Sequence, residues 1–106
     1  MHKLLCVPIV RFIDPGQPGF VELRLEDAEG RIWTFIEKVP IVTDKDLDAE
    51  SSYPQDGFVA CQVEGERVDS SGRRVIRVNT ATPWCVEAVE DRFVFEVFAE
   101  QLVDDQ

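Results

Sequence analysis

Short runs in which apolar and polar residues alternate, separated by Asp-x-x-Gly tetrapeptides, dominate this chain. Valine and isoleucine together supply 21 of the 106 residues and concentrate in these runs. Alternation with a period of two is typical of a strand with one buried face, and Asp-x-x-Gly is suited to hairpin turns. The pattern therefore predicts an all-β fold.

Residues 20–39 form the clearest local unit. The tetrapeptide at 27–30 fits a type I turn in which Gly30 takes a positive φ and forms a bulge. The three-residue loop that results places Leu25 opposite Trp33 on the more apolar face. The segment predicts a hairpin with one buried face.

Two further hairpins are expected downstream. One joins 58–68 to 73–80 through a second Asp-x-x-Gly turn, and a four-residue loop opposes Glu64 to Arg77. A three-residue loop, which opposes Glu66 to Ile76 instead, matches the alternation less well. The other hairpin crosses at Glu90-Asp91 and gathers on one face the apolar residues Trp84, Val86, Ala88, Phe93, Phe95 and Val97.

The remaining segments are a first strand and one long excursion. A strand over 4–13 contains Pro8, which cannot donate a ladder hydrogen bond and predicts an edge or a bulge. Between 40 and 57 the alternation stops, and Thr43 is expected to cap a short helix over 44–50. Six or seven strands with one short helix in a long loop predict a small antiparallel barrel or a two-layer sandwich. It should form a single domain over residues 1–106.

The charge balance restricts the possible partners. The chain has 21 acidic and 11 basic residues, a formal net charge of −10. Such a protein is repelled by nucleic acid and by anionic membranes, so neither is an expected partner, whereas a basic protein is attracted. Acidic surfaces also keep small proteins soluble, which is the plainer explanation of the same charge.

Residues suited to catalysis or metal binding are scarce. The single histidine is His2, at a terminus, so no Ser-His or Cys-His pair is available. Cys6, Cys61 and Cys85 form no CxxC motif, and we expect them to be reduced and buried in a cytoplasmic protein. We predict no enzyme activity, no cofactor and no metal site.

One partial calcium motif supports the same expectation. Asp44, Asp46 and Asp48 have the spacing of the first ligands of a calcium loop. However, Ala49 occupies the position that requires glycine, and Gln55 the position of the closing glutamate. We interpret the three aspartates as the acidic first turn of the expected helix.

Aromatic residues are the other candidates for recognition. Trp33 and Trp84 are expected in the core, each with its indole N–H bonded to a backbone carbonyl. Tyr53, in the irregular acidic loop, is expected to be exposed.

Two segments resemble known proteins. Residues 30–40 contain Gly-Arg-x-Trp-x-Phe-x-x-Lys-x-Pro and residues 82–87 contain Pro-Trp-x-Val-Glu. Both resemble short bacterial all-β proteins of about this length, to which no established activity is attached. The resemblance implies a bacterial single-domain protein and transfers no functional residue. A looser similarity to small β-barrels of the translation-factor type rests on strand pattern alone, and fold does not determine function.

The leading hypothesis is a non-enzymatic binding module that engages a basic protein; an immunity-type inhibitor of a basic toxin would be one instance. Its expected contact residues are Asp44, Asp46, Asp48, Glu50, Tyr53 and Asp56. The alternative is a β-barrel that binds a small molecule in a pocket lined by Trp33, Phe35, Trp84 and Phe95. A third possibility is self-association through the strand that contains Pro8.

Overall fold

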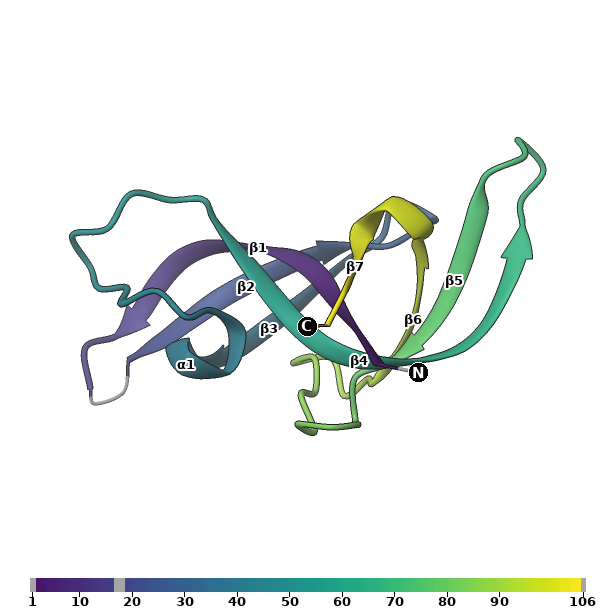
Figure 1. Ribbon diagram of the computed structural model, residues 1–106. Helices are drawn as coiled ribbons and strands as arrows, with labels where there is room; N and C mark the ends of the chain where they lie inside the picture. Colours follow the sequence, from purple (N-terminus) through teal and green to yellow (C-terminus); the bar gives the residue numbers. More distant parts are fainter. Residues whose placement is uncertain (1, 17–18, 106) are drawn as a thin grey trace.

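The computed structural model describes residues 2–16 and 19–105 of the protein. Within these residues seven strands form one antiparallel sheet that curls strongly into a half-barrel, with one short α-helix (Figure 1). The predicted all-β, barrel-like fold is confirmed. In chain order the elements are β1 (His2–Asp14), β2 (Phe20–Glu26), β3 (Ile32–Lys38), α1 (Val39–Val42), β4 (Gln55–Val68), β5 (Arg74–Asn79), β6 (Val94–Phe98), the 3-10 turn η1 (Ala99–Gln101) and β7 (Leu102–Asp104).

The first strand is the centre of the sheet. The strand order is β3-β2-β1-β4-β5-β6, and β7 pairs with β1 outside this path. Lys3 lies opposite Asp104, and its Nζ is 2.6 Å from the Asp104 Oδ1 atom. The two ends of the described chain therefore meet beside the central strand (Figure 1).

Pro8 does not lie on an edge strand, as one reading of the sequence predicted. It lies in central β1, opposite Asp56 of β4. On the other side of β1, pairing with β7 ends at Leu5 and pairing with β2 begins at Ile9. Pro8 thus occupies a gap in that ladder, where its missing N–H costs no strand hydrogen bond. The predicted bulge is present directly after it, between Ile9 and Arg11.

The hairpin of β2 and β3 confirms the predicted register. Leu25 pairs with Trp33, as the three-residue loop required. At the turn, Gly30 has a φ of 82° and its N–H donates to the carbonyl of Asp27 at 3.0 Å. The Asp27 Oδ1 atom accepts the backbone N–H groups of Glu29 and Arg31, each at 2.9 Å. An Asp-x-x-Gly sequence therefore forms a complete turn from its own atoms.

The hairpin of β4 and β5 contains both registers that the sequence left open. Near the turn Glu66 lies opposite Ile76, the pairing expected of a three-residue loop. A bulge between Val63 and Gly65 then shifts the ladder by one residue. Gly65, rather than Glu64, therefore lies opposite Arg77, so the favoured pairing was wrong there. The bulge increases the local twist of the strand.

The third predicted hairpin was wrong. Residues 84–89 form no strand, and the single bridge between Ala88 and Arg92 replaces the expected ladder. β6 pairs with β5 instead. Thr80 explains how the intervening loop folds without a ladder, because its buried hydroxyl bonds the backbone carbonyls of Val86 and Phe93 at 2.6 and 3.2 Å. Side-chain hydrogen bonding can take the place of strand pairing.

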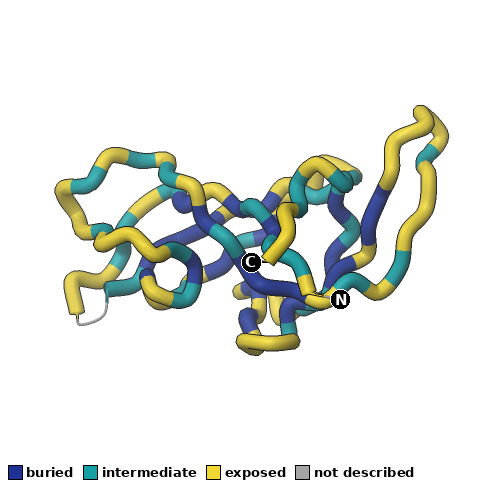
Figure 2. Tube along the Cα trace, viewed as in Figure 1, coloured by how far each residue is buried: buried dark blue, intermediate teal, exposed yellow. Residues whose placement is uncertain are grey.

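The hydrophobic core fills the concave face of the sheet. Alternate residues of each strand point inward, and the central strands are the most completely buried part of the chain (Figure 2). The loop between β5 and β6 contributes two further buried residues, and α1 closes one end. The buried cluster consists of Leu5, Val7, Ile9, Val21, Leu23, Leu25, Trp33, Phe35, Val39, Val42, Val59, Cys61, Ile76, Val78, Val86, Ala88, Phe95 and Val97.

The outer edge of β3 is partly covered by the loop between β5 and β6. The Val89 N–H donates to the Thr34 carbonyl at 2.8 Å, and the Thr34 N–H donates to the Glu90 carboxylate at 3.1 Å. The middle of this edge strand is therefore unavailable to another strand, a common protection against edge-to-edge association.

Candidate functional site

The acidic loop, which joins α1 to β4, does not contain the predicted helix. The helix α1 begins five residues earlier, at Val39, where Val39 and Val42 bury their side chains and Pro40 occupies the first turn. Thr43 is the C-cap of this helix. Its Oγ1 atom accepts the Lys45 N–H at 3.2 Å, the kind of hydrogen bond that an N-cap makes, but no helix follows directly in the described chain. Residues 44–50 offer only Leu47 for burial, so they lack the apolar stripe that stabilises a short helix.

The loop instead forms one wall of a surface hollow of about 780 Å³. Four of the six predicted contact residues line it, and all four are exposed: Asp44, Asp46, Asp48 and Glu50. The floor is largely apolar and comes from three separate segments, represented by Phe12, Val39, Pro40 and Leu47. The hollow is thus an apolar surface beside four carboxylates. Lys45 also lines it, and its Nζ donates to the Gln55 Oε1 atom at 3.4 Å.

Phe12 was missed as part of this site because it belongs to β1, far from the loop in sequence. Its ring packs so closely on Gly19 that a β-carbon at position 19 would lie 2.5 Å from two ring atoms. A glycine allows another group to come close to the backbone, but the sequence alone does not show that this group is the Phe12 ring.

Asp48 and Tyr53 hold the loop in shape. The Asp48 Oδ1 atom accepts the Glu50 N–H at 2.9 Å and the Ser51 hydroxyl at 3.3 Å. The Tyr53 hydroxyl donates to the Asp48 carbonyl at 2.7 Å, and burial, together with the Asp48 charge, raises the pKa of that hydroxyl. Tyr53 is half-buried against the core, so the prediction that it is exposed was wrong.

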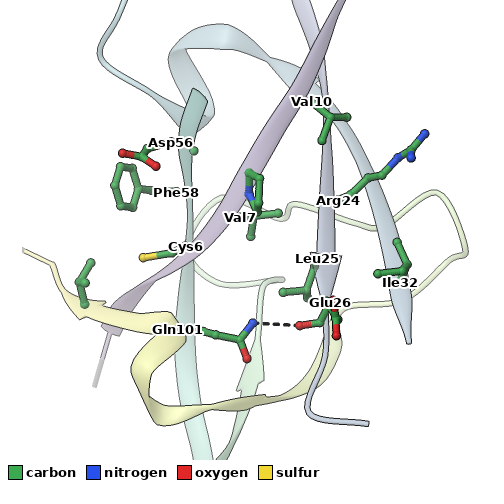
Figure 3. Close-up of a pocket in the computed structure, with 13 residues that line it drawn as sticks. Cys6, Val7, Val10, Arg24, Leu25, Glu26, Ile32, Asp56, Phe58 and Gln101 are labelled. Carbon is green, nitrogen blue, oxygen red and sulfur yellow. Dashed lines mark hydrogen bonds between the residues drawn. The ribbon is translucent and has the colours of Figure 1, made fainter. Parts of the chain in front are cut away.

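Asp56, the sixth predicted contact residue, lies in a different place. It belongs to β4 and lines a groove of about 690 Å³ on the outer face of the sheet (Figure 3). The gap between β2 and β7 forms this groove, and a hydrogen bond from Gln101 Nε2 to the Glu26 carbonyl, at 2.9 Å, spans the gap. Arg24 and Ile32 lie across the groove from Asp56 (Figure 3). The structure therefore separates Asp56 from the acidic loop.

The outer face also contains a buried carboxylate. Glu22 is 5% exposed, and its two oxygens accept Nε–H groups from Arg11 at 2.7 Å and from Arg24 at 2.8 Å. Burial favours the neutral acid, but the hydrogen bonds from Arg24 and Arg11 outweigh it and hold the pKa of Glu22 below its ordinary value. This cluster links β1 to β2, because Arg11 of β1 and Arg24 of β2 each donate to one carboxylate oxygen of Glu22.

In the described part of the chain, none of the four residues of the predicted aromatic pocket lines either of the two hollows above. Trp33 and Phe35 each pack edge to face on Phe95 in the core, with ring centroids 5.7 and 5.6 Å from that of Phe95. Trp84 lies outside the core with 62% of its surface exposed, contrary to expectation. The Trp33 indole N–H donates to the Asp27 carboxylate at 2.9 Å, not to a backbone carbonyl as predicted.

The remaining chemistry is limited in the described chain. All three cysteines are free thiols; Cys61 is buried, Cys6 half-buried and Cys85 exposed, so the prediction of burial was wrong for Cys85. Burial raises the pKa of Cys61 to about 11. In residues 2–16 and 19–105, no three His, Cys, Asp or Glu side chains come together as a metal site. Nor does any helix there have the length and apolar character to cross a membrane.

Comparison with known proteins yields no match to a family model, to a curated protein or to a solved structure.

Proposed function

We propose that this protein is a non-enzymatic binding module that engages a basic protein through the hollow beside the acidic loop. The supporting observation is the combination of an apolar floor, including Phe12 and Leu47, with exposed carboxylates on Asp44, Asp46 and Glu50. Lysine and arginine combine an aliphatic stem with a cationic end. A side chain of this kind satisfies both parts of the hollow at once.

The overall charge favours the same partner. A net charge of −10 raises the rate of encounter with a basic surface at low ionic strength. The hollow then supplies the position at which one basic side chain is held. We place the module in the cytoplasm as part of this proposal, because its three cysteines are free thiols.

The test is titration with a hexa-lysine peptide by isothermal calorimetry at low salt. The variant combines Asp44→Lys, Asp46→Lys and Glu50→Lys, and it keeps Asp48 because that carboxylate bonds the loop backbone. We expect affinity to fall about tenfold or more, since three attractive contacts become repulsive. Affinity capture from a lysate of the native cell, eluted by a salt gradient, then identifies the natural partner.

A matched control separates the hollow from the overall charge. Glu26→Lys, Glu29→Lys and Asp105→Lys change the net charge by the same amount at exposed positions outside the hollow. The proposal requires the control to retain most of the affinity. Equal losses in the two variants would mean that only net charge matters and that the hollow is not the binding site.

A further inference from the structure

Trp84 is the most unusual surface residue of this protein. It exposes 62% of its surface, whereas Trp33 exposes 4%. Tryptophan is among the most expensive side chains to leave in water and among the commonest anchors of protein interfaces. Its neighbours Pro83 and Cys85 are exposed as well, so the indole stands on an open surface.

The loop beneath Trp84 is held in one conformation. The Cys85 N–H donates to the Ala81 carbonyl at 2.9 Å, and the Val86 N–H donates to the Thr80 carbonyl at 3.0 Å. Thr80 itself is fully buried. Cys85 has a φ of 54°, a left-handed conformation that a residue with a β-carbon adopts only when its surroundings impose it. A side chain presented on a fixed backbone loses little conformational freedom when it binds.

The charge around Trp84 indicates what it would contact. The segment 81–91 contains Glu87, Glu90 and Asp91 and no basic residue. The next residue, Arg92, is already committed, since its guanidinium lies 4.7 Å from the centre of the Trp33 ring. The segment that contains Trp84 is therefore acidic, which favours contact with a cationic group.

The chain itself shows how such aromatic faces are covered. Arg31 lies 4.3 Å from the centre of the Trp33 ring, and Arg73 lies 3.4 Å from the centre of the Phe98 ring. In the described residues no arginine takes this position over Trp84. An arginine from another molecule would supply the missing cation–π contact.

The loop also lies beside the same strand as the proposed hollow. Val89 and Glu90 bond to Thr34 in the middle of β3, and β3 leads directly into α1, which contributes Val39 and Pro40 to the floor of the hollow. One protein surface that follows the edge of β3 can therefore reach both places.

We infer that Trp84 is the aromatic anchor for the basic partner and stacks on an arginine side chain of that protein. The inference rests on the proposed function for the class of partner. It adds a second contact surface, made by Trp84 and the carboxylates of 87–91, and a preference for arginine over lysine. Arginine is favoured because its planar guanidinium stacks on an aromatic face and remains charged.

The experiment compares hexa-arginine with hexa-lysine on the intact protein. We expect hexa-arginine to bind about two- to fivefold more tightly, the factor that an exposed cation–π contact supplies. In ¹⁵N spectra the indole signal of Trp84 should shift when hexa-arginine is added, while that of buried Trp33 should not. Trp84→Leu should abolish the arginine preference, because it weakens hexa-arginine binding more than hexa-lysine binding.

Two further comparisons make each outcome decisive. Ile32→Ala removes a comparably exposed apolar side chain on the outer groove, and it should leave the arginine preference intact. An arginine preference that survives Trp84→Leu, or an unmoved Trp84 signal, overturns the inference. The hexa-lysine affinities of the hollow variant and its control report on the proposed function separately. If neither peptide binds the unmodified protein, both proposals fail.

Discussion

The two Asp-x-x-Gly hairpins of this protein have the same turn and very different surroundings. In each, the aspartate N–H donates to the carbonyl four residues on, at 2.9 Å, and the glycine has a positive φ, 82° in one and 87° in the other. The Asp69 Oδ1 atom accepts the Ser71 and Arg73 N–H groups at 2.9 Å, as Asp27 does in its own turn. The local chemistry of the two turns is therefore equivalent.

The difference lies in what each turn contacts. The turn of β2 and β3 is part of the body of the protein, because the Ala28 N–H donates to the Glu96 carbonyl at 2.8 Å and Asp27 holds the Trp33 indole. The turn of β4 and β5 projects away from the body, and its tip is exposed (Figures 1 and 2). There the third hydrogen bond of the carboxylate comes from the Ser71 hydroxyl of the same turn.

The same sequence motif can therefore stabilise only its own turn, or it can also donate to and accept from groups in the body of the protein. A turn whose aspartate bonds only within the turn contributes local stability, which water can partly replace. A turn that also satisfies a buried indole becomes part of the tertiary structure.

The largest effect is expected at the turn aspartates. Asp27→Ala removes two turn hydrogen bonds and leaves the Trp33 indole N–H without its acceptor, so the free energy of unfolding should fall by about 3 kcal/mol. Asp69→Ala should lower the free energy of unfolding by less than half as much, since water can reach every group that loses its hydrogen bond to Asp69. Urea unfolding measures both. Similar losses in the two variants would show that the contact of Asp27 with the Trp33 indole adds nothing to stability.

A smaller effect is expected from the charge pairs of the two hairpins. Glu22 in β2 is buried between two arginines, whereas Glu66 in β4 forms an exposed pair with Arg74. Hydrogen bonding to arginine lowers the pKa of both carboxyls, although burial opposes the shift at Glu22. A lowered folded-state pKa means stability that is complete above the unfolded pKa, about 4.3, and lost as pH falls through the folded value.

Glu22→Gln should therefore lower the free energy of unfolding at pH 7 by about 2 kcal/mol and flatten its fall between about pH 5 and pH 3. Glu66→Gln should leave the pH profile nearly unchanged, since solvent screens the exposed pair. Urea midpoints at several pH values measure both variants. A flattened profile for Glu66→Gln would show that burial is not the deciding difference.

The smallest effect is expected at the turn glycines, where the hairpins should behave alike. A β-carbon at Gly30 or Gly72 would meet no atom within 4 Å, so only the positive φ opposes alanine. Gly30→Ala and Gly72→Ala should each cost about 1 kcal/mol and differ by less than about 0.5 kcal/mol. Thermal unfolding compares them. A clearly larger loss at Gly30 would show that packing on the body also constrains the turn backbone.

The sequence was most informative where pairing partners lie close together in the chain. The register of Leu25 with Trp33 follows from the turn between them, and the structure confirms it. The pattern failed at 84–89, where Val86 and Ala88 are buried without forming a strand. Apolar alternation identifies residues that will be buried, but it does not say whether a ladder or a buried hydroxyl such as that of Thr80 satisfies their backbone.

The candidate site was predictable only in part for the same reason. The loop at 44–50 stands out as acidic and irregular, so four of its carboxylates were identified as contact residues. The apolar floor was not, because Phe12 reaches it from another strand. Trp84 was assigned to the core, since hydrophobicity alone cannot distinguish a buried tryptophan from one displayed on a loop.

By itself, the sequence determined the strand-rich fold, the turns and the negative charge, because these depend on backbone preferences, on residues a few positions apart and on composition. Only the tertiary structure decided which strand pairs with β6, which side chains meet around the acidic hollow, and which of the two tryptophans faces water. Those outcomes depend on contacts between distant segments. Their energies are set by burial and by hydrogen-bond partners that do not exist until the sheet has curled.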